Sequence, residues 1–118
     1  MNIFLLIVLG SVGVLARYFL AWLLPSEPFS WSVLTVNVVG SFFVGVFMNQ
    51  KFMPPQVDAS LHLAVIFGLL GGLTTFSSYS ADAVRLIHES KWLVLAIVVL
   101  LNNALSIAAC FIGHKIVT

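Results

Sequence analysis

A run of thirteen residues, 68–80, interrupts an apolar stretch that is long enough to cross a lipid bilayer. The run reads GLLGGLTTFSSYS and contains three glycines and six hydroxyl-bearing residues. An irregular backbone within hydrocarbon leaves amides and carbonyls without hydrogen-bond partners, and each such group costs several kcal/mol. An interruption of this kind is tolerated only where it is buried in protein, lines a water path or coordinates an ion. The run therefore predicts a permeation or ion site.

The composition of the chain is that of an integral membrane protein. Of its 118 residues 61% are hydrophobic and 8% are charged, whereas about 25% are charged in a typical soluble domain. The formal net charge of +1 comes without a cluster of lysines and arginines, so we expect no nucleic-acid partner. No paired carboxylates and no phosphate-binding loop occur in the sequence. We therefore expect one small all-α membrane domain that is not an enzyme.

Four apolar segments have lengths close to the about 20 residues that cross a bilayer as a helix. The predicted helices cover residues 2–24, 32–50, 61–88 and 92–116. The third is broken near residues 71–75, which leaves two half-helices. No basic residue precedes the first apolar run, so we interpret that segment as a retained helix rather than a secretory signal. Small residues four apart, such as Gly68 and Gly72, predict close packing between helices.

Lysine and arginine are divided almost evenly between the two sides of the predicted membrane domain. Four spans place Lys51 and Lys115 on one side and Arg85 and Lys91 on the other, and Arg17 changes the difference by one. Because the distribution of these residues sets membrane orientation, the sequence favours insertion in both directions as an antiparallel homodimer. Four helices also leave little room for a pore, which favours two subunits. The alternative is a small protein with few charges whose orientation is set by other signals.

Two polar residues within the predicted spans have both structural and functional interpretations. The Asn37 amide can donate two hydrogen bonds and accept through its oxygen, so it can contact a solute or join two helices. Asp82 is the only carboxylate within a span. It precedes Arg85 by three residues, which favours an ion pair on one helix face. A proton relay is the functional alternative for Asp82.

Polar and aromatic side chains share helix faces in the second half of the chain. Asn102, Ser106 and Cys110 recur every four residues, which places them on one face of a helix. Phe76 and Tyr79 are three residues apart and therefore adjacent on a helix. Such a pair is often simple packing, but the positive ring edges can also face an anion without the strong binding of a fixed charge.

Three sequence motifs together resemble those of the CrcB/Fluc family of fluoride channels. Residues 68–80 resemble the family signature GGxTTFSTF, TVNVVGSFFVG resembles its second-helix motif, and GSVGVLARY resembles its N-terminal pattern GxxGAxxRY. The similarity covers nearly the whole chain. It implies a fluoride-selective passive channel, built as a dual-topology antiparallel homodimer in the prokaryotic inner membrane. Such a channel lets cytoplasmic fluoride leave the cell and protects against its toxicity.

The resemblance also implies site residues. In the family, backbone carbonyls at the helix break hold a structural sodium ion at the dimer interface, and the matching residues are Gly71 and Thr74. The residues that match the family's fluoride pathway are Asn37, Phe76, Ser77, Tyr79, Ser80, Asn102 and Ser106. Two positions depart from the family pattern, because Tyr79 stands where phenylalanine is usual and Asp82 where glutamate is usual. The extra hydroxyl of Tyr79 could donate a hydrogen bond to fluoride or to a neighbouring side chain.

Two other classes of membrane protein share some of these features. A small proton-coupled multidrug exporter has the same length, span number and dual topology, but it needs a carboxylate in its first helix. Residues 2–24 contain none. A non-transporting membrane subunit is the second alternative, and it would not need the combination of helix break, amide and hydroxyl track.

Overall fold

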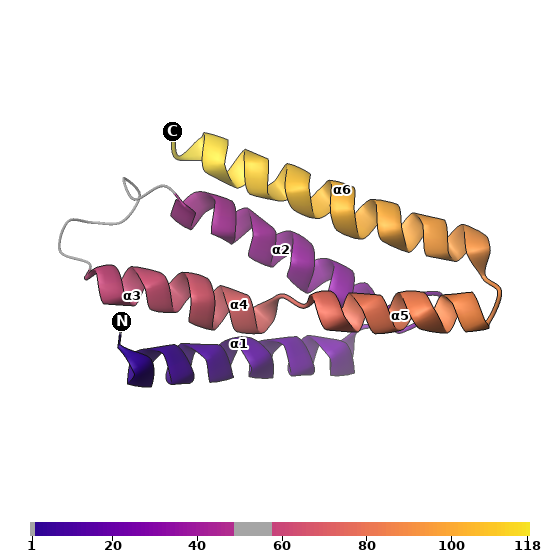
Figure 1. Cartoon of the computed structure of the whole chain (residues 1–118), viewed down its shortest axis with the longest axis horizontal. Helices are drawn as coiled ribbons and strands as arrows, with labels where there is room; N and C mark the ends of the chain where they lie inside the picture. The colour runs from indigo at the N-terminus through magenta and orange to yellow at the C-terminus, as the bar shows by residue number, and fades with distance from the viewer. Residues whose placement is uncertain (1, 49–57) are drawn as a thin grey trace.

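The computed structural model describes residues 2–48 and 58–118, which form four long helical segments (Figure 1). Three are continuous helices: α1 (Ile3–Leu23), α2 (Trp31–Met48) and α6 (Trp92–Ile116). The third segment consists of α3 (Ala59–Leu63), the π-helix η2 (Ala64–Leu70), α4 (Gly71–Leu73) and α5 (Phe76–His88). All four segments are long and apolar enough to cross a membrane, which confirms the predicted all-α class and four spans. Residues 49–50 of the predicted second span, and Lys51, lie outside the described residues.

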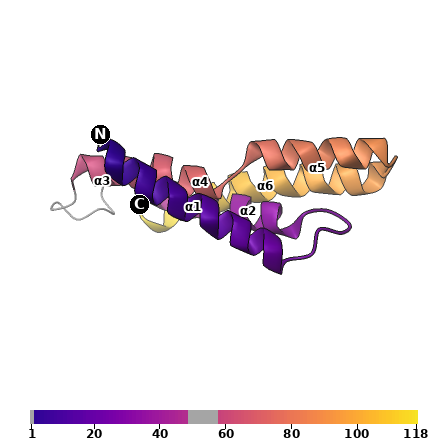
Figure 2. The same ribbon diagram turned by 90° about the horizontal axis from the view of Figure 1, so that it is seen from below.

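The helices pack as two pairs that run along the long axis of the molecule. α1 lies beside η2 and α4, whereas α2 lies beside α6 (Figure 1). Beyond the interruption, α5 packs against the first part of α6, and the view in Figure 2 shows these two helices side by side. The chain therefore passes from one pair to the other through the broken third segment.

The ends of the helices follow from local capping groups. The side chain of Asn2 accepts a hydrogen bond from the backbone N–H of Leu5 at 3.2 Å, which caps the start of α1. Pro25 follows soon after the end of α1, where its ring cannot continue a helix. The side chain of Thr75 accepts from the N–H of Ser78 at 3.0 Å and starts α5 in the same way.

The third segment is interrupted at Thr74 and Thr75, at the end of the range in which the sequence predicts a break. Thr74 has φ −80° and ψ 155°, and Thr75 has φ −152° and ψ 120°, so both are extended. Gly71 is still helical, with φ −64° and ψ −37°. Figure 1 shows the break as a thin connection between α4 and α5 near the middle of the molecule. The irregular backbone thus lies at mid-span.

Close backbone contacts between helices depend on glycine. A Cβ atom at Gly13 of α1 would overlap the carbonyl oxygen of Leu69, and one at Gly72 would lie 2.6 Å from the carbonyl oxygen of Gly10. Where α2 crosses α6, a Cβ atom at Gly45 would overlap the carbonyl oxygen of Cys110. These contacts confirm that Gly68 and Gly72 lie at a close helix contact, because a Cβ atom at Gly68 would be 3.0 Å from the Leu6 carbonyl oxygen.

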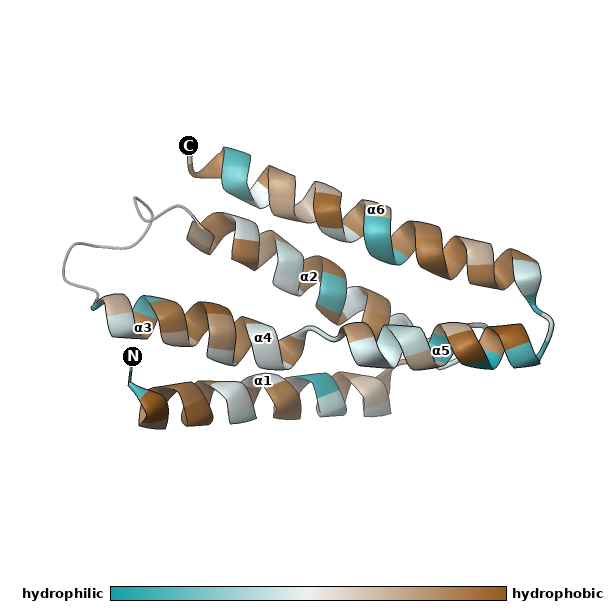
Figure 3. Ribbon diagram, in the orientation of Figure 1, coloured by the Kyte–Doolittle hydropathy of each residue, from teal (hydrophilic) through white to brown (hydrophobic). Residues whose placement is uncertain are grey.

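Apolar side chains cover the outside of the molecule, as expected for a protein in lipid. Phe4 and Trp22 of α1, for example, are 75% and 76% exposed. Figure 3 shows brown, hydrophobic ribbon along most of each segment, with hydrophilic colour in α5, near several helix ends and at mid-span positions of α2 and α6. The main buried cluster joins the α1–α2 loop, α2, α5 and α6 through Phe29, Val33, Leu34, Tyr79, Leu86 and Val98. This cluster holds α5 and α6 together next to the break.

Candidate functional site

The amide of Asn37 on α2 supports the interrupted backbone directly. Its Oδ1 accepts a hydrogen bond from the Thr75 N–H at 2.8 Å, and its Nδ2 donates to the Thr75 carbonyl oxygen at 3.0 Å. In an unbroken helix the Thr75 N–H would donate to the carbonyl of Gly71. One side chain therefore satisfies both backbone groups of Thr75, which is only 7% exposed.

A second amide extends this network to α6. Asn37 Nδ2 also donates to Oδ1 of Asn102 at 3.1 Å, and Asn102 Nδ2 donates to the Val98 carbonyl oxygen at 3.1 Å. Asn102 is buried, with 7% of its surface exposed. The break is thus connected by hydrogen bonds to both α2 and α6. Both N–H groups of Asn37 therefore donate to other groups of the protein, which agrees with the interpretation of Asn37 as a residue that joins helices.

A pocket of about 270 Å³, lined mainly by asparagine, serine and threonine residues, lies beside the break. Side chains from α2, the break, α5 and α6 line it, and none of them belongs to aspartate, glutamate, lysine, arginine or histidine. The lining residues are Asn37, Ser41, Thr74, Thr75, Phe76, Tyr79, Asn102, Asn103, Ser106 and Ile107. The Ser106 hydroxyl is buried and has no hydrogen-bond partner among the described residues. The pocket therefore offers neutral hydrogen-bonding groups at mid-span.

Two aromatic rings of α5 border this pocket in different environments. The ring centroids of Phe76 and Tyr79 are 5.3 Å apart, and their planes meet at 61° in an edge-to-face arrangement. Phe76 is 74% exposed, whereas Tyr79 is 9% exposed and belongs to the buried cluster. The Tyr79 hydroxyl accepts a hydrogen bond from Asn103 Nδ2 at 3.1 Å.

The predicted pathway residues are only partly brought together. Asn37, Phe76, Tyr79, Asn102 and Ser106 all line the pocket. Two other predicted residues, Ser77 and Ser80, are not among its lining side chains, and the Ser77 hydroxyl lies 3.2 Å from that of Thr75. The pocket also includes Ser41 and Asn103, which the resemblance did not assign. Asn103 follows Asn102 directly in sequence, so its position beside the predicted polar face was the sequence signal that could have identified it as a pocket residue.

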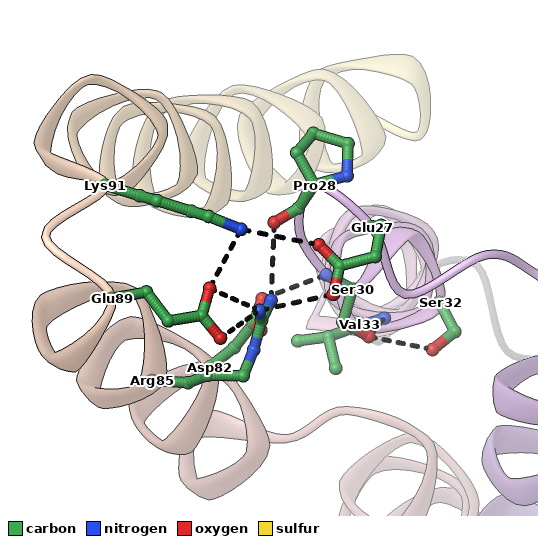
Figure 4. Close-up of polar contacts among 9 residues, drawn as sticks. All are labelled: Glu27, Pro28, Ser30, Ser32, Val33, Asp82, Arg85, Glu89 and Lys91. Atoms are coloured by element: carbon green, nitrogen blue, oxygen red, sulfur yellow. Dashed lines mark hydrogen bonds and ion pairs between the residues drawn. The ribbon is translucent and has the colours of Figure 1, made fainter.

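Asp82 lies outside this pocket, midway along α5, in a cluster of charges that extends to the C-terminal end of the helix (Figure 4). Its Oδ1 accepts from Arg85 Nη2 at 2.9 Å, which confirms the predicted ion pair. Its Oδ2 accepts from the backbone N–H of Ser30 at 2.9 Å. Both carboxylate oxygens are therefore occupied, and Asp82 ties the α1–α2 loop to α5.

The same cluster extends to the turn before α6. Glu89 bonds to Arg85 at 3.2 Å and to Lys91 at 2.9 Å (Figure 4). The hydrogen bond from Lys91 lowers the pKa of the Glu89 carboxyl, and the same contact raises the pKa of the Lys91 ammonium. Arg17 lines a second pocket, of about 600 Å³, together with Asp82 and Arg85. Arg17 therefore belongs to the end of the molecule that carries Arg85 and Lys91.

Four segments long and apolar enough to cross a membrane, with a pocket lined mainly by amide and hydroxyl residues beside a mid-span break, define a small multi-pass membrane protein with a site between its helices. Residues 4–114 match the model of the family described as CrcB-like protein, Camphor Resistance (CrcB), and the chain belongs to this family. This confirms the resemblance found in the sequence motifs.

Relatives over most of the chain are named fluoride-specific ion channel FluC. The protein of Geobacter sulfurreducens is 35% identical, over 90% of this chain and 85% of its own length. That of Rhizobium etli is 38% identical, over 91% of this chain and 88% of its own length. That of Aliivibrio salmonicida is also 38% identical, over 91% of this chain and 87% of its own length.

Proposed function

We propose that this chain forms a fluoride-selective passive ion channel. The observation that carries the proposal is the mid-span pocket, which is lined mostly by amide and hydroxyl residues, has no aspartate, glutamate, lysine, arginine or histidine in its lining, and is bordered by two aromatic rings. Membership of the CrcB family and the names of the relatives point to the same solute. A proton-coupled exporter receives no support, because α1 contains no aspartate or glutamate.

The chemistry of the pocket suits a small anion that must lose water and still be released. Neutral amides and hydroxyls donate hydrogen bonds to an anion, and ring edges present the positive part of their quadrupole. A fixed cation in the same place would bind the anion more tightly and slow its departure. Asn37 contributes by hydrogen bonding to both backbone groups of Thr75 at the break, and Ser106 contributes a hydroxyl that has no hydrogen-bond partner among the described residues.

The cellular role follows from the acid–base chemistry of fluoride. Hydrogen fluoride is a weak acid that crosses membranes in its neutral form and releases fluoride in a less acidic cytoplasm. A passive pore lets the trapped anion leave down its gradient. We therefore place the protein in the prokaryotic plasma membrane, where it protects the cell against fluoride.

The functional unit that we propose is an antiparallel homodimer. Arg17 lies with Arg85, so the count of lysine and arginine becomes three on that side, with Lys91, against two on the other, Lys51 and Lys115. A difference of one is a weak orientation signal. Exposed Phe76 borders the pocket of a single chain, which leaves room for a second copy to complete the path.

We also assign a structural sodium ion to the break, held by the backbone carbonyls of Gly71 and Thr74. The fit rests on hydrogen bonds that leave both carbonyls without their usual helical donors. The Thr75 N–H donates to Asn37 rather than to the Gly71 carbonyl, and the Ser78 N–H donates to Thr75 Oγ1 rather than to the Thr74 carbonyl. Carbonyl oxygens are hard ligands suited to hard cations such as sodium. The ion would neutralise these dipoles between two subunits.

Removing sodium should lower the thermal stability of the purified protein. A ligand that binds only the folded dimer stabilises it by mass action, so the melting temperature should rise with sodium concentration. The measurement is thermal unfolding in detergent with sodium chloride, and with N-methylglucamine chloride at equal ionic strength as the control. Identical melting temperatures in the two salts would exclude the proposed sodium site.

Replacing Phe76 with isoleucine should cut fluoride flux by at least about tenfold, which corresponds to about 1.4 kcal/mol of barrier. Isoleucine lacks the positive ring edge, and the side chain is exposed enough that the fold of the subunit should survive. Fluoride efflux from liposomes tests this, with gel filtration to show that assembly is retained. Flux equal to that of the wild type would exclude this ring from the path.

A further inference from the structure

The hydroxyl of Tyr79 is held in the pocket by one specific neighbour. Asn103 Nδ2 donates to Tyr79 Oη at 3.1 Å and to the Val99 carbonyl oxygen at 2.9 Å. The second bond, to the preceding turn of α6, fixes the orientation of the Asn103 amide. Both Asn103 and Tyr79 line the pocket beside the break. The phenol oxygen is therefore positioned from α6, although the ring belongs to α5.

The direction of this hydrogen bond leaves the hydroxyl proton of Tyr79 available for donation to another acceptor. An asparagine Nδ2 group can only donate, whereas a phenol oxygen can accept one hydrogen bond and still donate its own O–H. None of the hydrogen bonds among residues 2–48 and 58–118 uses the Tyr79 O–H as donor. By contrast, both N–H groups of Asn37 are committed, to Thr75 and to Asn102.

We propose that the Tyr79 hydroxyl, positioned by Asn103, donates a hydrogen bond to the anion in the pocket. This inference rests on the proposed function and assigns a specific donor to it. A ring edge alone attracts an anion weakly, whereas a hydrogen bond to an ionised acceptor is roughly twice as strong as a neutral one. The hydrogen bond from Asn103 also polarises the phenol and makes its O–H a better donor.

The effect of such a donor on transport is specific. A stronger contact in the pocket favours occupancy by fluoride at low concentration, while release becomes slower. Tyr79 should therefore lower the fluoride concentration at which flux is half-maximal. Asn103 does not need to touch the anion, so it is a positioning residue that acts through Tyr79.

A double-mutant cycle tests the proposal, with initial fluoride efflux from liposomes measured over a range of internal fluoride concentrations. Tyr79→Phe keeps the buried ring and removes only the hydroxyl. We expect it to raise the half-saturating fluoride concentration about tenfold, as for loss of a hydrogen bond to a charged partner. The flux at saturating fluoride should change by a smaller factor. Asn103→Ala should raise it about threefold, since the hydroxyl stays but is no longer oriented. The double variant should match Tyr79→Phe alone.

Each other outcome of the cycle overturns part of the proposal. An unchanged half-saturating concentration in Tyr79→Phe excludes the hydroxyl as a donor, while fluoride-selective flux of the wild type leaves the proposed function standing. Additive effects of the two substitutions exclude Asn103 as the positioning residue. Asn103→Leu is a second variant that also removes the amide, at a position that is exposed. Absence of fluoride flux in the wild type overturns the proposed function and this inference together.

Discussion

Replacing Asn37 with alanine should abolish fluoride flux and lower the free energy of unfolding by about 2–4 kcal/mol. The change removes the hydrogen-bond partners of the Thr75 N–H and of Asn102 Oδ1, and the donor from Asn37 to the Thr75 carbonyl oxygen. Thr75 and Asn102 are both buried, so water cannot easily replace the lost bonds. The estimate exceeds the about 0.6 kcal/mol typical of side-chain hydrogen bonds between membrane helices, because irregular backbone has no alternative partner within its own helix.

Thr35→Val is the matched control on the same helix. The Thr35 hydroxyl donates only to the Trp31 carbonyl oxygen of its own helix, at 2.8 Å. Its loss removes a polar group from α2 without touching the break, so flux and stability should stay close to those of the wild type. Unfolding in detergent and fluoride efflux from liposomes measure the two effects. If Asn37→Ala and Thr35→Val behaved alike, Asn37 would have no special role at the break.

Replacing Gly13 with alanine should disrupt the packing of α1 on the third segment and reduce the yield of folded protein. The added Cβ atom would overlap the Leu69 carbonyl oxygen and lie 2.8 Å from the Leu73 nitrogen. Both are backbone atoms, so a side-chain rotation cannot relieve the overlap. Overpacking of this kind typically costs about 1–3 kcal/mol, and more where backbones must separate.

Gly10→Ala provides the comparison one helical turn earlier. A Cβ atom there would have its nearest neighbours, the Cα and oxygen atoms of Gly68, at 3.9 Å, an ordinary contact distance. The gain in helix propensity from glycine to alanine, about 1 kcal/mol, should leave this variant at least as stable as the wild type. Thermal unfolding of the two variants in detergent decides the point, and equal melting temperatures would contradict the close approach at Gly13.

The helices and the break could be predicted because their signals are local. Apolar length predicts each span, and the two threonines after the glycines of the third span lie where the backbone becomes extended. The ion pair of Asp82 with Arg85 could likewise be predicted, because the two residues are three positions apart on one helix. In contrast, the π-helix η2 (Ala64–Leu70) has no recognised sequence pattern that separates it from an ordinary apolar helix.

The contacts of the site depend on residues far apart in sequence and needed the structure. Asn37 meets Thr75 across 38 residues and Asn102 across 65. Sequence spacing correctly indicated that Phe76 and Tyr79 are adjacent, but not that one ring is exposed and the other buried. The bond from Asn103 to Tyr79 depends on how α5 packs on α6, which no local pattern encodes.

The most direct test of the central claim is the ratio of fluoride to chloride efflux from liposomes that contain the purified wild-type protein. Liposomes without protein supply the background rate for each anion. We expect rapid loss of fluoride and chloride loss close to the background, because the pocket offers neutral hydrogen-bond donors and fluoride is a smaller ion and a stronger hydrogen-bond acceptor than chloride. Equal rates for the two anions, or fluoride efflux no faster than in empty liposomes, would contradict the claim.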